Sequence, residues 1–108
     1  MSDRRFGIEP LEGERTFKLV GPLDLPSHMA LTELMGELVR SPGDITLDIS
    51  EVTFMDSSGL RVVLDACRDL ADRGSVRLIN PAGQVEKLLR LTGAPEALSN
   101  LEVVRAEV

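Results

Sequence analysis

The sequence has almost none of the residues on which disulfide-bonded and zinc-bound domains depend. Cys67 is its single cysteine and His28 its single histidine, which excludes an internal disulfide and leaves too few ligands for a structural zinc site. Tryptophan and tyrosine are absent and phenylalanine occurs three times, so there are few rings on which bases could stack. No Gly-rich phosphate loop with its lysine is present either. We therefore expect no metal, no ATP site and no other cofactor.

Long hydrophobic runs and an excess of basic charge are also missing. Twelve lysines and arginines stand against eighteen acidic residues, and the net charge of −6 repels phosphate backbones and anionic lipids. The N-terminal segment has no apolar stretch of the length that a signal peptide or a membrane span requires. We expect a cytoplasmic protein with no direct nucleic-acid partner and no membrane association.

What the sequence does contain is the composition and periodicity of one globular domain. With 43% hydrophobic and 28% charged residues, residues 1–108 have room for a single hydrophobic core. The apolar spacing predicts the order strand, strand, helix, strand, helix, strand, helix, strand. The residues that set this pattern are, in turn, Phe6 and Ile8; Phe17 and Leu19; Leu31, Leu34, Met35 and Leu38; Ile45, Leu47 and Ile49; Leu60, Val63, Leu64, Cys67 and Leu70; Val76, Leu78 and Ile79; Val85, Leu88 and Leu89; and Leu101, Val103 and Val104.

The strand that begins at Ile45 indicates how the layers are arranged. Its apolar residues alternate with polar ones, whereas a strand covered on both faces would be an unbroken apolar run. We therefore predict an α/β fold, with a mixed sheet of four to five strands and helices mainly on one face. Ser27 is the predicted cap of the first helix, and Asn80 with Pro81 the predicted cap and first residue of the third.

One edge of this sheet gathers the candidate site. Consecutive strand-helix-strand units place the carboxyl ends of their parallel strands along the same edge. The strands are predicted to end near Val20, Ser50 and Asn80. The loops that follow should therefore be neighbours, and they span residues 21–27, 51–56 and 80–83.

The most unusual segment on that edge is Asp56-Ser57-Ser58-Gly59, at the start of the longest predicted helix. Asp56 or Ser57 can accept hydrogen bonds from the free amides of the first turn. Gly59 is predicted to leave the surface uncovered by a side chain. By its residues alone the segment is a capping sequence and indicates no particular function.

The run from Leu47 to Leu60, LDISEVTFMDSSGL, closely resembles the signature of STAS domains and, among them, of anti-sigma-factor antagonists. The segment from Gly21 to Asp24 is similar to the family's Gly-Glu-Leu-Asp turn, and the third helix resembles the family's later helix with its Thr-Gly end. Pro22 stands where the family has glutamate, and the chain ends after its last predicted strand, where many members add a helix.

The resemblance implies a switch in binding and no catalysis by this chain. In that family the serine directly after the aspartate is phosphorylated by a partner that is both anti-sigma factor and serine kinase. Ser57 matches that position, and Ser58 is its neighbour. Unphosphorylated protein would bind the kinase and free a sigma factor, phosphorylation of Ser57 would abolish binding, and a serine phosphatase would restore it. The partner-binding residues so implied are Asp24, Asp56, Ser57, Ser58 and Gly59.

Two other functions remain open from the sequence. A STAS subunit of a transporter or lipid-trafficking complex would use the same fold without being phosphorylated. An enzyme would need Ser57 as nucleophile and His28 as base, but Met55 stands where a nucleophile elbow has glycine. Cys67 lies in the apolar stripe of the central helix and is predicted to be a buried core residue.

Overall fold

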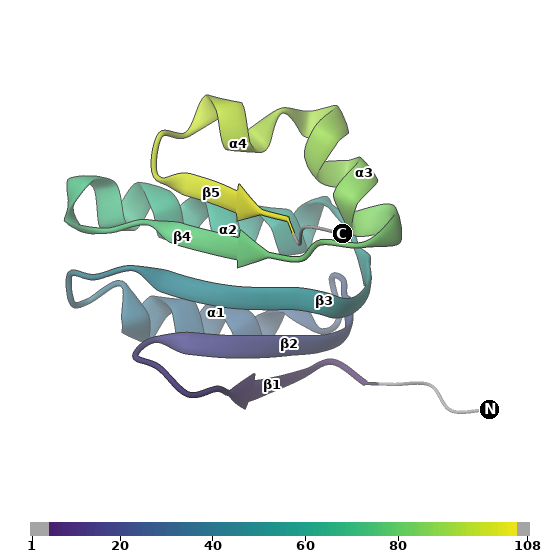
Figure 1. The fold of residues 1–108 in the computed structure, drawn as a ribbon. Helices are drawn as coiled ribbons and strands as arrows, with labels where there is room; N and C mark the ends of the chain where they lie inside the picture. The colour runs from purple at the N-terminus through teal and green to yellow at the C-terminus, as the bar shows by residue number, and fades with distance from the viewer. Residues whose placement is uncertain (1–4, 106–108) are drawn as a thin grey trace.

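A computed structural model describes residues 5–105, and a five-stranded sheet organises them (Figure 1). The strands follow one another across the sheet in chain order. The first two are antiparallel and form the predicted hairpin, and each later pair is parallel. The strands are β1 (Gly7–Pro10), β2 (Thr16–Leu23), β3 (Ile45–Met55), β4 (Val76–Ile79) and β5 (Leu101–Val104).

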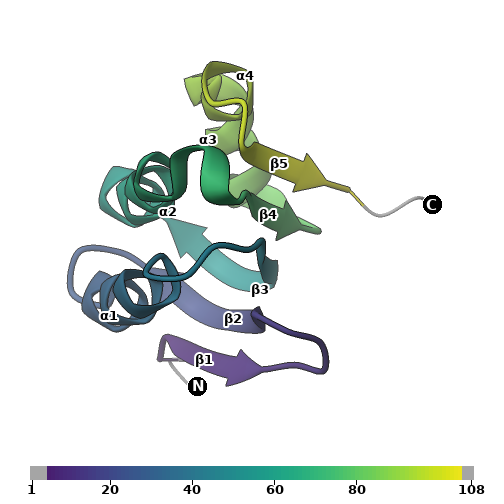
Figure 2. The ribbon, with the colours of Figure 1, turned by 90° about the vertical axis from the view of Figure 1, so that its left-hand side faces the viewer.

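The helices lie on one side of this sheet (Figure 2). They are α1 (His28–Leu38), α2 (Ser57–Leu70), the 3-10 turn η1 (Ala71–Arg73), α3 (Gly83–Thr92) and α4 (Ala94–Ala97). α1 and α2 lie behind the sheet in Figure 1, and α3 and α4 lie toward its β5 edge. The predicted α/β fold, with a mixed sheet and helices mainly on one face, is confirmed.

The core lies between the sheet and these helices. Ile45, Leu47 and Ile49 of β3 are fully buried, while Thr46 and Asp48 between them are half-buried on the opposite face. Successive side chains of a strand point to opposite faces, so the alternation in the sequence identified the covered face correctly. α2 contributes a buried stripe of Leu60, Val63, Ala66, Cys67 and Leu70.

β2 and β3 run further than their hydrophobic pattern indicates. The pattern predicts that they end near Val20 and Ser50, but β2 continues to Leu23 and β3 to Met55. Their register shifts twice along this length, so the buried residues after Ile49 fall at Val52 and Met55 and no longer at every second position. Most of the loop predicted after Ser50 is therefore strand.

Neither predicted helix cap is made by the expected side chain. Ser27 precedes α1 without a capping bond, because its hydroxyl is bound to the Asp24 carboxylate (2.7 Å). Asn80 has a φ of +59°, and α3 begins only at Gly83. A helix cap is normally extended, and Ala82 takes that place with φ −138° and ψ 155°.

Candidate functional site

Asp56 joins the carboxyl ends of β2 and β3 at one edge of the sheet. Its backbone N–H donates to the carbonyl oxygen of Leu23 (3.3 Å). The N–H of Leu25 donates to its Oδ2 atom (3.3 Å). These bonds hold the segment after β2 against the start of α2, so the predicted meeting of these two chain segments is confirmed.

Gln84 attaches α3 to the same edge. The N–H of Met55 donates to Gln84 Oε1 (2.9 Å), and Gln84 Nε2 donates to the carbonyl oxygen of Met55 (2.8 Å). One side chain thus satisfies both backbone groups of the last residue of β3. A single glutamine in the first turn of a helix has no sequence signal that would indicate this role.

Asp56 is also the cap of α2. Its Oδ1 atom accepts the N–H groups of Ser58 (3.0 Å) and Gly59 (3.1 Å) and the hydroxyl of Ser58 (2.6 Å). The Ser58 hydroxyl above all, and then the amides of Gly59, Ser58 and Leu25, hold the pKa of this carboxyl below its usual value despite the opposing effect of desolvation. Asp56 is therefore a carboxylate at neutral pH.

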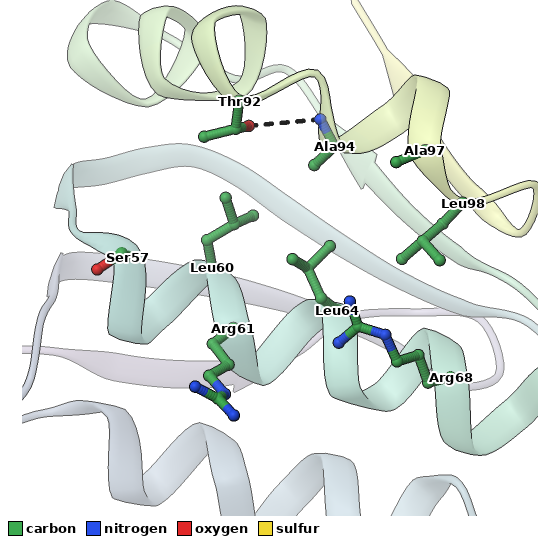
Figure 3. Close-up of a pocket in the computed structure, with 9 residues that line it drawn as sticks. All are labelled: Ser57, Leu60, Arg61, Leu64, Arg68, Thr92, Ala94, Ala97 and Leu98. Carbon is green, nitrogen blue, oxygen red and sulfur yellow. Dashed lines mark hydrogen bonds between the residues drawn. The ribbon is translucent and has the colours of Figure 1, made fainter.

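The two serines use their hydroxyls differently. Ser58 is half-buried and its hydroxyl is bound to Asp56. Ser57 is the first residue of α2, is exposed, and has no side-chain hydrogen bond within residues 5–105. Figure 3 shows its side chain at the end of the helix. Of the two, only Ser57 presents a free hydroxyl to another molecule.

Gly59 has a role in packing. It is buried, and a Cβ atom at this position would lie 2.7 Å from both the carbonyl oxygen and the Cγ atom of Leu23. The prediction that Gly59 leaves the surface uncovered is therefore wrong. Without a side chain there, α2 comes into close contact with the end of β2.

Asp24 shapes the segment that follows β2. Its Oδ1 atom accepts the N–H (3.2 Å) and the hydroxyl (2.7 Å) of Ser27, and its carbonyl oxygen accepts the N–H of His28 (2.9 Å). The side chain is half-buried. Asp24 thus fixes the turn that brings Leu25 to Asp56, and no hydrogen bond joins it to Ser57 in the described part of the chain.

His28 and Ser57, the base and nucleophile considered from the sequence, do not contact each other by a hydrogen bond within residues 5–105. The Nδ1 atom of His28 lies 3.4 Å from the hydroxyl of Thr32 on its own helix, and no hydrogen bond links His28 to Ser57 among the residues described. Cys67 is buried as predicted. Burial raises the pKa of its thiol to about 11, so at neutral pH it is a protonated core side chain.

Exposed apolar side chains lie on the segments that meet at Asp56. Leu25 is 65% exposed, Met29 58% and Phe54 42%. They belong to the segment after β2, the first turn of α1 and the end of β3. Each of these side chains could contribute apolar area to a contact with another molecule.

The STAS domain family model matches residues 8–106. The chain belongs to the STAS domain family. Among solved structures, this STAS domain is similar to the anti-sigma factor antagonist SpoIIAA in its unphosphorylated form, with 24% identity over 94% of this chain and 88% of that chain and a TM-score of 0.71. It is similar to an anti-sigma factor antagonist from Mycobacterium paratuberculosis, with 22% identity over 90% of this chain and 83% of that one and a TM-score of 0.74.

A third similar structure is the Bacillus cell fate determinant SpoIIAA in the phosphorylated form, with 23% identity over 94% and 91% of the two chains and a TM-score of 0.66. At these identities the similarity establishes the fold. No match was found among curated proteins.

Residues 5–105 of this STAS domain contain no helix long and apolar enough to cross a membrane. In the same residues no group of three or more His, Cys, Asp and Glu side chains is placed to hold a metal ion.

Proposed function

We propose that this STAS domain is an anti-sigma-factor antagonist that acts by partner switching. Unphosphorylated, it binds an anti-sigma factor that is also a serine kinase, and the sigma factor is released. The kinase phosphorylates Ser57, the complex dissociates, and a serine phosphatase returns the domain to its binding form. The domain catalyses no reaction itself, needs no cofactor and acts in the cytoplasm.

The difference between Ser57 and Ser58 is the observation that carries this proposal. A protein kinase must draw a serine hydroxyl into its own active site. Ser57 can enter without losing a hydrogen bond, whereas Ser58 would first have to give up its 2.6 Å bond to Asp56. The STAS family membership, and the likeness to SpoIIAA solved in both unphosphorylated and phosphorylated forms, support the same assignment.

Phosphorylation would act through charge at the surface that the partner covers. A phosphate adds about −1.5 to −2 charges at neutral pH, on the residue directly after the Asp56 carboxylate. A partner would have to remove water from this dianion, which costs several kcal/mol when no cation replaces the lost hydration. We expect a loss of affinity of at least about a hundredfold, since each 1.4 kcal/mol is tenfold.

The proposed partner-binding residues divide by what they do. Ser57 makes the direct contact that phosphorylation breaks. Asp24 and Asp56 hold the segments of the surface in place through their hydrogen bonds, Ser58 lowers the pKa of Asp56, and Gly59 permits the approach of α2 to β2. These four residues therefore contribute to partner binding chiefly by fixing the shape of the surface around Ser57.

The test is to mix the protein and Mg-ATP with each histidine-kinase-like ATPase encoded in its genome, starting with any that is encoded beside it. We expect one of them to bind the unphosphorylated protein and to transfer one phosphate to Ser57, located by mass spectrometry. Phosphate on Ser58 alone would overturn the site. Stable binding to a transporter ATPase without phosphorylation would overturn the function in favour of a transporter subunit.

A further inference from the structure

A groove of about 520 Å³ runs along α2 from Ser57 to Arg68, between α2 and the corner formed by α3 and α4 (Figure 3). Its walls are mainly apolar. Leu60 and Leu64 contribute from α2, and Ala94, Ala97 and Leu98 from the opposite side. The groove therefore begins at the candidate phosphorylation site and leads away from it.

The charged side chains in the groove lining are both basic, although the protein as a whole carries a charge of −6. Arg61 and Arg68 are 80% and 58% exposed and lie 3.9 Å and 3.3 Å from the carboxylate of Asp65. Exposed ion pairs of this kind contribute little stability. Both guanidinium groups can therefore turn to a carboxylate of another molecule at small cost.

The lining residues of α2 form one stripe. Ser57, Arg61, Leu64 and Arg68 follow the three- and four-residue spacing of a single helix face. In Figure 3 the side chain of Arg68 lies beside Leu64, and that of Arg61 points away from α3 and α4. Arg68 lies eleven positions after Ser57, which at 1.5 Å per residue is a rise of about 16.5 Å. A helix of about three turns laid along α2 matches this length.

We infer that the groove seats an acidic amphipathic helix of the anti-sigma factor, with its apolar side chains between α2 and α4 and its carboxylates on Arg61 and Arg68. This inference rests on the proposed function and adds a contact beyond the Asp56–Gly59 segment. Because Ser57 stands at the end of the groove, a phosphate there meets the carboxylates of the seated helix and repels them. The arginines that attract the helix and the phosphate that expels it thus lie on the same face of α2.

The experiment compares the affinity of the kinase identified above for groove variants and for controls with the same change of charge. Arg68→Glu and Ala97→Glu each place a negative charge in the groove without changing the Asp56–Gly59 segment. Arg40→Glu and Leu91→Glu are the controls, since both residues are exposed and neither lines the groove. We expect each groove variant to weaken binding at least tenfold in 50 mM salt, less so in 500 mM salt, and each control to change it less than twofold. Circular dichroism and melting curves confirm that all four variants are folded.

Hydrogen exchange of the kinase, with and without this protein, identifies the occupant. We expect protection of one helical segment of about eleven residues that carries Asp or Glu on one side, and loss of that protection with Arg68→Glu.

Three results would overturn the groove assignment. The first is wild-type affinity of both groove variants while Ser57→Asp is still unable to bind, which leaves the proposed function intact. The second is protection of a basic or non-helical segment of the kinase. The third is the formation of concentration-dependent dimers of this protein that the groove variants abolish. If no kinase binds the wild-type protein, the proposed function fails and the inference fails with it.

Discussion

Ser57 and Ser58 are adjacent on α2, yet Asp56 engages the hydroxyl of only one of them. An aspartate that caps a helix accepts from the amides two and three positions further on, and here the side chain at the first of those positions also reaches its carboxylate. This geometry leaves the residue directly after the aspartate free. At the scale of single residues, the cap itself selects which serine another enzyme can reach.

Ser57→Ala should leave stability unchanged and make binding permanent. The side chain is exposed and makes no hydrogen bond among the described residues, so we expect the free energy of unfolding in urea to change by less than about 0.5 kcal/mol. The variant should bind the kinase like the wild type and stay bound in the presence of ATP. Ser57→Asp should bind weakly.

The matched control is Ser58→Ala, which removes a hydrogen bond to a carboxylate and should lower the free energy of unfolding by about 1 to 2 kcal/mol. If Ser57→Ala were the more destabilising of the two, the assignment of the cap would be wrong.

Gly59→Ala should destabilise the protein, because its Cβ atom would collide with Leu23 at 2.7 Å. We expect a loss of about 1 to 3 kcal/mol in the free energy of unfolding, as for other overpacked core positions. Gly36→Ala is the control, since Gly36 lies in α1 with no atom within 4 Å of a Cβ. There alanine should stabilise by about 0.5 to 1 kcal/mol through its better helix propensity. Equal effects in urea denaturation would show that the contact with Leu23 is unimportant.

At the scale of elements, α2 is held at both ends by residues outside it. Asp56 satisfies the amides at its start. At its end, the Nδ2 atom of Asn100 donates to the carbonyl oxygens of Cys67 (2.8 Å), Ala71 (3.0 Å) and Gly74 (3.1 Å). The carbonyl of Cys67 also accepts the N–H of Ala71, and the other two carbonyls follow the helix. Asn100, just before β5, thus ties the end of α2 to the turn after it. The helix that presents Ser57 is thereby anchored to the far edge strand.

Asn100→Ala should lower the free energy of unfolding by about 1 to 3 kcal/mol, since it removes the hydrogen bonds from Asn100 to the end of α2 and to the turn after it. Asn100→Asp should be worse at neutral pH, because its carboxylate would face carbonyl oxygens and the negative end of the helix dipole. Urea denaturation at pH 7 measures both variants. An aspartate variant as stable as the wild type would contradict this account of how α2 ends.

At the scale of the whole molecule, two carboxyl groups should set the acid limit of stability. The Ser58 hydroxyl lowers the pKa of Asp56, and Arg105 followed by Arg90 lowers that of Glu86. A lowered folded-state pKa means that the unfolded chain takes up the proton first as the pH falls. The stability from these groups is therefore present above about pH 4 to 5 and is lost as the pH drops through their folded pKa values.

Asp56→Asn should flatten this acid dependence while keeping a capping oxygen in place. We expect melting temperatures recorded from pH 7 to pH 2.5 to fall less steeply below pH 4 than those of the wild type. Glu33→Gln is the control, because Glu33 is exposed and has no ion pair in the described residues. Parallel acid profiles for Asp56→Asn and the wild type would contradict the link between this carboxylate and stability.

Phosphorylation of Ser57 should leave the fold intact. The positive end of the α2 dipole favours the phosphate by about 0.3 to 1 kcal/mol, and repulsion from Asp56 across water is of similar size. Backbone amide shifts in NMR spectra should therefore be confined to residues 52–62 and to the neighbouring residues 21–27 and 80–83. Large shifts in β5 would reveal a change of the whole domain.

The fold could be predicted because its signals are local or periodic. The alternation in β3 identified the covered face of the sheet, and the spacing of Val85, Leu88 and Leu89 identified α3 up to Gly93. The extension of β3 to Met55 could not be predicted from the sequence, because register shifts between β3 and β2 break the two-residue alternation of buried and exposed side chains. The contribution of Gln84 was equally hidden, since its partner is a backbone group 29 positions away.

The sequence by itself determined the class of fold, the order of its elements and the position of the Asp-Ser-Ser-Gly segment, since hydrophobic period and helix capping act over a few residues. Only the tertiary structure decided that Gly59 is buried against Leu23 and that α2 and α4 enclose a groove whose lining includes two arginines. These features depend on distances between segments far apart in the chain. The packing of α2 against the sheet and α4 sets those distances, and no local pattern records them.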